Sequence, residues 1–116
     1  MILERAISIE MLKNIASEYF EDMVKAVVDI DRQIIAINSE LHSDLERILL
    51  EDGSRQESLW GINLYPEYFG TDNFIEFDSL INIRPWQDNR SRYVENDNTR
   101  SQIIKIVGKY FKKDAA

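Results

Sequence analysis

Two stretches with strand-like alternation, residues 59 to 65 and 74 to 84, constrain the fold of this chain more than any other feature. A connection rich in turn-forming residues, including Gly70 and Asp72-Asn73, joins them and predicts a β-hairpin. The alternation assigns one set of side chains to the core: Trp60, Ile62, Leu64, Ile75, Phe77, Ile81 and Ile83. The opposite face of this hairpin is polar, so the segment predicts both a sheet and a surface that could bind.

The rest of the chain adds another hairpin and three helices. Residues 23 to 37 alternate with the period of a strand, with a turn at Asp31-Arg32. Helical spacing predicts three helices. The first begins after Ser8, the second after Asn38 or Ser39, and the third near Asn96, and Gly53 ends the second. The order is α-ββ-α-ββ-α. We therefore expect one α+β domain over residues 1–116, with an antiparallel four-stranded sheet from two hairpins and helices on one face.

The helical stripes also predict which side chains are buried. Leu41 would belong to the apolar stripe of the second helix, and Ile104 to that of the third. Gly108 weakens the interior of the third helix by about 1 kcal/mol relative to alanine, so it could mark a close approach of this helix to the sheet.

Composition excludes several classes of protein. The 116 residues are 44% hydrophobic and 30% charged, as in an ordinary folded domain. The chain has no cysteine, which excludes disulfides, thiolate nucleophiles, iron–sulfur clusters and cysteine zinc sites. No apolar run is long enough to span a bilayer, and residues 1 to 10 lack the apolar core of a signal peptide. We therefore expect a cytoplasmic protein without a membrane partner.

Charge is distributed unevenly along the chain. Residues 1 to 83 carry six Lys/Arg and 17 Asp/Glu, whereas residues 84 to 113 carry eight and three. With Asp114 the net charge of the chain is −7. The local basic and aromatic cluster consists of Arg84, Arg90, Arg92 and Trp86, which could grip phosphates or stack on a base. The pI of 4.7 argues against a nucleic-acid partner. Alternatively, the arginines pair with nearby carboxylates while Trp86 packs on the last helix.

Five short motifs together resemble a known family. They are W-G-I-N-L-Y-P at 60–66, S-L-I-N-I-R-P at 79–85, N-R-S-R at 89–92, V-K-A-V-V-D-I at 24–30 and E-L-H-S-D at 40–44. The chain resembles an uncharacterised family of small microbial proteins that is known only as a domain of unknown function. The resemblance covers nearly the whole chain and implies one compact domain, but it implies no activity, substrate or catalytic residue.

The polar face of the second hairpin is the first candidate site. Together with the loop that follows, it offers amide, hydroxyl, carboxylate and guanidinium groups for an anionic or polar ligand: Asn63, Tyr65, Asp78, Asn82, Arg84, Arg90 and Arg92. The alternative is that these side chains form ordinary solvated pairs between strands.

A weaker candidate is a divalent metal site. His42 and Glu46 are four residues apart on the second predicted helix, and Asp29 or Asp31 of the first hairpin could join them. Such a site would permit metal-assisted hydrolysis of a phosphate-containing substrate, with Arg84 or Arg92 holding the anion. No serine elbow or glycine-rich phosphate loop is present, and no catalytic residue is assigned.

The second hairpin also carries more aromatic residues than its core face needs: Trp60, Tyr65, Tyr68, Phe69, Phe74 and Phe77. They either cap the edge of the core or form an apolar interface, most simply in a homodimer. We expect a binding or interaction module without catalytic activity, homodimeric or bound to a protein partner, with the polar sheet face and the loop 84–92 as its contact surface. The metal-assisted hydrolase is the alternative.

Overall fold

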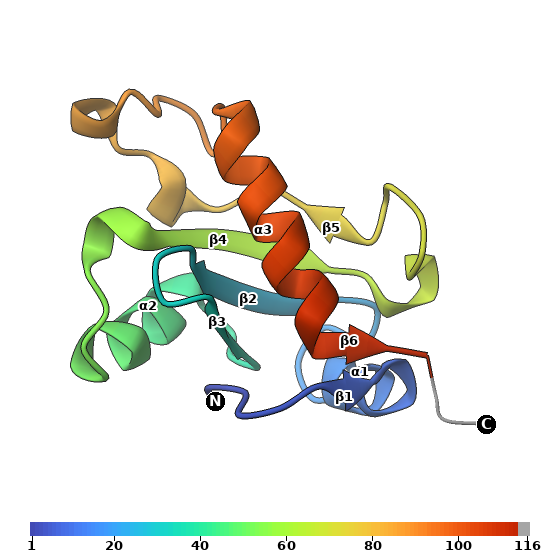
Figure 1. The fold of residues 1–116 in the computed structure, drawn as a ribbon. Coiled ribbons are helices and arrows are strands. Elements are labelled where there is room, and N and C mark those ends of the chain that lie inside the picture. Colours follow the sequence, from blue (N-terminus) through green and yellow to red (C-terminus); the bar gives the residue numbers. More distant parts are fainter. Residues whose placement is uncertain (114–116) are drawn as a thin grey trace.

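The computed structural model of the protein describes residues 1–113. Its main sheet contains β2 (Val24–Asp29), β3 (Ile34–Ile37), β4 (Leu59–Leu64) and β5 (Ile75–Glu76), antiparallel and in the order β3-β2-β4-β5. Because β2 pairs with both β3 and β4, the two hairpins adjoin in one sheet (Figure 1). The expected α+β class and the four-stranded antiparallel sheet are confirmed.

Three α-helices accompany the sheet: α1 (Ile9–Ala16), α2 (His42–Glu51) and α3 (Asp97–Tyr110). Polar side chains cap α1 and α3 where the spacing predicts. The Ser8 hydroxyl accepts the backbone N–H of Met11 at 3.1 Å, and Asn96 Oδ1 accepts that of Thr99 at 3.0 Å. A short parallel pair, β1 (Ile7–Ser8) with β6 (Phe111–Lys112), joins the residue before α1 to the end of α3.

Helices cover both faces of the sheet, which corrects the expectation that all of them lie on one face. In Figure 1, α3 crosses one face, and its Ile103 and Val107 belong to the larger apolar core with Ala26 and Val28 of β2. On the other face, Leu45 and Leu49 of α2 pack with a second apolar set that comprises Val27, Ala36 and Leu59. A strand buried on both faces reads as a continuous apolar run, and adjacent Val27 and Val28 show this pattern.

The second hairpin is shorter than its sequence predicts. β5 has only two residues, and the chain then forms 3₁₀ turns at Leu80–Asn82 and Pro85–Gln87. The predicted core residue Ile81 packs on the second apolar cluster, on the α2 face, and Ile83 is exposed. The segment from Ser79 to Arg92 is therefore a folded loop beside β4, and Figure 1 shows it beyond one end of α3.

Three residues in or next to the helices depart from their predicted environments. α2 begins at His42 rather than at Asn38 or Ser39, so Leu41 lies at the N-cap and is 54% exposed. On α3 Ile106 is buried whereas Ile104 is 53% exposed. Gly108 does not approach the sheet closely, because a Cβ there would meet no atom within 4 Å. Among residues 1–113, none of the helices combines the length and the apolar content that crossing a membrane requires.

Candidate ligand-binding groove

Asn82 and Arg84 do not lie on an open polar face, because both point at the edge of β4. Asn82 Oδ1 accepts the backbone N–H of Gly61 at 2.8 Å, and its Nδ2 donates to the carbonyl of Gly61 at 3.0 Å and that of Arg92 at 2.9 Å. The Arg84 guanidinium donates to the carbonyls of Gln56 at 2.5 Å and Leu59 at 2.7 Å. These two side chains thus occupy the place that a neighbouring strand would take.

Burial confirms that Asn82 and Arg84 form part of the structural framework. Their residues are 0% and 1% exposed, and the Arg84 guanidinium lies 4.1 Å from the centre of the Trp60 ring. Burial lowers the pKa of Arg84, an effect that Glu46 and Glu57 oppose. A ligand on the surface could not reach either side chain without displacing the loop.

The remaining polar residues of the second hairpin form a network at its β5 end. Asn63 Nδ2 donates to Glu76 Oε1 at 2.8 Å, and the Tyr65 hydroxyl donates to the same oxygen at 3.1 Å. Desolvation and the nearby carboxylate of Glu76 raise the pKa of Tyr65 to about 12. Asp78 binds Arg92 through two hydrogen bonds of 2.6 and 3.2 Å. This network is negatively charged around Tyr65.

The predicted basic cluster is dispersed. Arg84 is buried, Arg92 is paired with Asp78, and Arg90 lies on the surface 3.7 Å from Asp88. Trp86 does not pack on α3 as one alternative proposed, since 74% of it is exposed. The loop itself is tightly held, because Asn89 Nδ2 donates to three carbonyl oxygens, those of Asn82, Ser91 and Tyr93.

The three candidate metal ligands are not gathered around one point. Asp29 Oδ1 accepts the backbone N–H groups of Asp31 and Arg32, both at 2.9 Å, and so shapes the turn after β2. His42 Nε2 lies 2.8 Å from the carbonyl oxygen of Ile62, to which it donates. Burial lowers the pKa of His42 and raises that of Glu46. Within residues 1–113, no three His, Asp or Glu side chains lie close enough to hold a metal ion.

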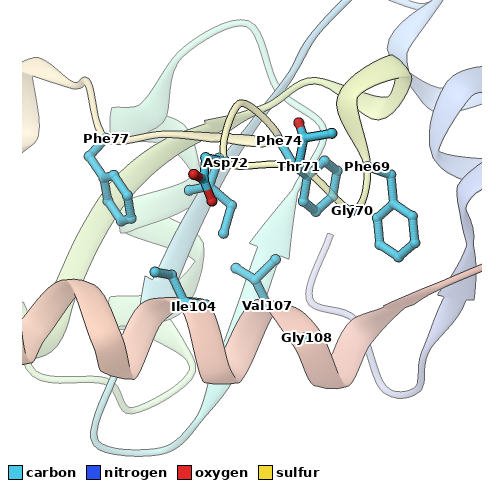
Figure 2. A pocket seen from close by; sticks show the side chains of 10 residues that line it. Phe69, Gly70, Thr71, Asp72, Phe74, Phe77, Ile104, Val107 and Gly108 are labelled. Carbon is cyan, nitrogen blue, oxygen red and sulfur yellow. The ribbon is translucent and has the colours of Figure 1, made fainter.

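The structure instead contains an apolar groove between α3 and the segment 69–77. Its volume is about 400 Å³. Figure 2 shows Phe69, Phe74 and Phe77 along one side of the groove and Ile104 and Val107 of α3 along the other. Phe69 and Phe74 pack edge to face with ring centres 5.1 Å apart. We call this site the aromatic groove.

Two glycines leave the aromatic groove open. Gly108 lies on the α3 side, where a side chain would extend into empty space. Gly70 has a φ of +86°, a conformation that glycine adopts readily, and it turns the chain between Phe69 and Thr71. The Thr71 hydroxyl is engaged by the Tyr68 carbonyl, to which it donates at 2.7 Å. Asp72 is the charged residue among those that line the groove.

The comparisons with known proteins identify the family. A model of a family described as proteins of unknown function, DUF5674, matches residues 1–110. The chain belongs to this family. Searches of curated proteins and of solved structures found no match. The expected resemblance to an uncharacterised family is therefore confirmed, and it brings no chemistry to the groove.

The sequence pointed to one side of the aromatic groove and missed the other. The excess of aromatic residues at Phe69, Phe74 and Phe77 indicated either an interface or a cap on the core. The three rings line the groove, and Phe74 also packs on the core residue Phe111, with ring centres 6.0 Å apart. The contribution of α3 was missed because Ile104 was assigned to the core and Gly108 to a close helix–sheet contact. The signal available in the sequence was the isolated Gly108, one helical turn after Ile104.

Proposed function

We propose that this protein is a binding module without catalytic activity of its own, and that it binds through the aromatic groove. The observation that carries the proposal is the apolar cavity of about 400 Å³. Ligand sites are typically concave, mostly apolar and about 300–1,000 Å³ in volume. A short chain seldom leaves three phenylalanines around such a space unless something fills it.

The polar residues considered as catalytic or metal-binding candidates have structural roles, which supports binding rather than catalysis. Asp29, His42 and Arg84 each bind backbone groups that hold turns or strands in place. Within residues 1–113, Asp29, His42 and Glu46 do not form a group that could hold an ion, so the geometry lends no support to the alternative hypothesis, a metal-assisted hydrolase of phosphate-containing substrates. No observation favours that second function.

A fluorescent probe tests the groove directly. N-phenyl-1-naphthylamine is uncharged and brightens in apolar sites, so we expect its emission to rise with the wild-type protein. Gly108→Leu adds a side chain where the groove is empty and should abolish the increase. Gln102→Leu adds the same apolar group to an exposed position outside the groove and should leave it unchanged. Equal emission from all three proteins would refute the groove as the binding element.

We also propose that the protein is a cytoplasmic homodimer, joined through the loop 79–92. The absence of cysteine supports a reducing compartment. The loop supports the dimer, because it is held by buried Asn82 and Asn89 yet exposes Leu80 by 66% and Trp86 by 74%. Tryptophan is enriched among the residues that dominate binding energy at interfaces, and a rigid loop loses little entropy when it docks.

Native mass spectrometry of untagged protein measures the assembly state. We expect a dimer that dissociates when Trp86 is changed to Ser. Tyr19→Ser serves as the matched control, because Tyr19 is a comparably large exposed aromatic residue at the end of α1. A protein that stays monomeric at high concentration would exclude this interface. A dimer that does not dissociate when Trp86 is changed to Ser would exclude it as well.

A further inference from the structure

A second hollow adjoins the aromatic groove and differs from it in character. It has a volume of about 290 Å³ and shares Asp72 and Ile75 with the groove. Its other walls include Tyr65, Tyr68 and Glu76. A ligand seated in the groove can therefore extend past Asp72 into a space formed by two phenol rings and two carboxylates.

The carboxylates of Asp72 and Glu76 make this second hollow negatively charged, and Arg92 acts on Glu76 only from beyond ion-pair distance. Within residues 1–113, no lysine or arginine nitrogen lies within 4.0 Å of the carboxylate of Asp72 or of Glu76. Asp78 is the contrasting case, since Arg92 neutralises it. Desolvation is the main cause of the raised pKa of Tyr65, and the hydrogen bond to Glu76 and the nearby carboxylates add to it.

The two tyrosines add a surface suited to a cation. The ring centres of Tyr65 and Tyr68 are 6.4 Å apart and the ring planes are inclined by 54°. Tyr68 is 50% exposed, so its ring is accessible to a ligand. Aromatic faces attract ammonium groups, most strongly those with alkyl substituents that water solvates weakly. Anions are disfavoured here, because they would meet the carboxylates of Asp72 and Glu76, neither of which forms an ion pair within residues 1–113.

We infer that the ligand is a small amphipathic cation, with its hydrocarbon part in the aromatic groove and its ammonium group against Tyr65, Tyr68, Asp72 and Glu76. This inference rests on the proposed binding function and names the ligand class. Charge complementarity selects the head group, and the phenylalanines with Ile104 select the tail. The occupant is a small molecule because both hollows are concave and adjoin, as in the pockets that enclose such ligands.

Competition between matched probes tests the inference. Decyltrimethylammonium, 1-decanol and decyl sulfate share one tail and carry a positive, neutral and negative head. Each would be titrated against bound N-phenyl-1-naphthylamine, the two ions below their critical micelle concentrations and the alcohol below its solubility limit. We expect the cation to bind about tenfold more tightly than the sulfate at low salt, with the alcohol between them. The difference should shrink as salt is added, because the head-group site is open to solvent.

Charge-removing variants locate the head group. Asp72→Asn and Glu76→Gln should each reduce the affinity for decyltrimethylammonium about two- to fivefold while leaving that for 1-decanol unchanged. Glu51→Gln is the control, because it removes the same charge from the exposed end of α2. Tetramethylammonium, which has no tail, should bind far more weakly than the decyl compound.

The outcomes separate the inference from the function on which it rests. If the three probes compete equally and Gly108→Leu abolishes all binding, the groove binds apolar groups and the cationic ligand is refuted. The same conclusion follows if Asp72→Asn affects the cation no more than Glu51→Gln does. If no probe competes, or if binding survives Gly108→Leu, both the inference and the proposed function fail.

Discussion

On the α2 face of the sheet a Cβ added to Gly61 would lie 2.6 Å from the side chain of Ser79, whereas on the α3 face a Cβ added to Gly108 would meet no atom within 4 Å. In the first region Asn82 binds both backbone groups of Gly61, and the loop packs against β4. In the second region aromatic side chains surround an open space. The first region contributes to the stability of the fold, and the second leaves room for a ligand.

Removal of the Asn82 side chain should have the largest effect. Asn82→Ala would leave the N–H and carbonyl groups of Gly61 without partners in a buried site, and the carbonyl of Arg92 would keep only the N–H of Ser79 as a donor. Each such group costs about 1–3 kcal/mol, so we expect a loss of about 3–5 kcal/mol in the free energy of unfolding by urea. Asn98→Ala on the surface of α3 should change it by less than about 0.5 kcal/mol. Similar losses in the two variants would contradict the structural role of Asn82.

A methyl group at Gly61 tests the tight packing. Gly61→Ala should cost about 2–3 kcal/mol, because the new Cβ would collide with both side-chain atoms of Ser79. In Ser79→Gly those atoms are absent, so the double variant should be more stable than the sum of the two single changes predicts. Urea unfolding of the four proteins gives this coupling energy. Strict additivity would show that the collision is not the cause.

His42 gives the α2 face a pH dependence. Because burial lowers the pKa of His42 in the folded protein, the unfolded chain binds more protons below the ordinary value of 6.5. Stability should therefore fall as the pH drops from 6.5 towards the lowered folded pKa, with a slope of at most about 1.4 kcal/mol per pH unit.

The single histidine of the chain makes this prediction separable. Glu46, whose pKa is raised by burial, contributes the opposite slope, since its folded form holds a proton that the unfolded form has released. The difference between the wild-type protein and His42→Gln, measured by urea unfolding between about pH 5.5 and 7.5, isolates the histidine. Parallel pH profiles for the two proteins would contradict a buried neutral imidazole.

The comparison also explains what the sequence could and could not predict. Strand periodicity placed Ile62 and Leu64 correctly in the core, and the caps Ser8 and Asn96 marked two helices, because these signals are local. Asn82 and Arg84 were assigned to an outward strand face by the same alternation. They turn inward because their side chains form hydrogen bonds with backbone groups at the edge of β4. A local sequence pattern does not indicate which backbone groups of a distant strand lack a partner.

The candidate site depended still more on tertiary structure. The aromatic residues at 69, 74 and 77 were visible as an excess, and their partner on α3 was not. Whether Ile104 or Ile106 faces the core depends on a rotation of α3 by a fraction of a turn, which an Ile-Ile pair at 103–104 leaves ambiguous. The hydrogen bond of His42 to the Ile62 carbonyl likewise depends on how α2 docks, so the metal hypothesis could not be judged without coordinates.

Gly108→Ala should produce the smallest change and the opposite sign to Gly61→Ala. Alanine is favoured over glycine inside a helix by about 0.5–1 kcal/mol, and a Cβ at this position meets nothing, so the free energy of unfolding should rise by that amount. Gly53→Ala sharpens the test, because a Cβ there also meets nothing but φ is +105°, where alanine is strained. We expect urea unfolding to show a gain for Gly108→Ala and a loss for Gly53→Ala. A loss at Gly108 would mean that α3 lies closer to the 69–77 segment than the open groove requires, and the region assigned to binding would then be as tightly packed as the α2 face.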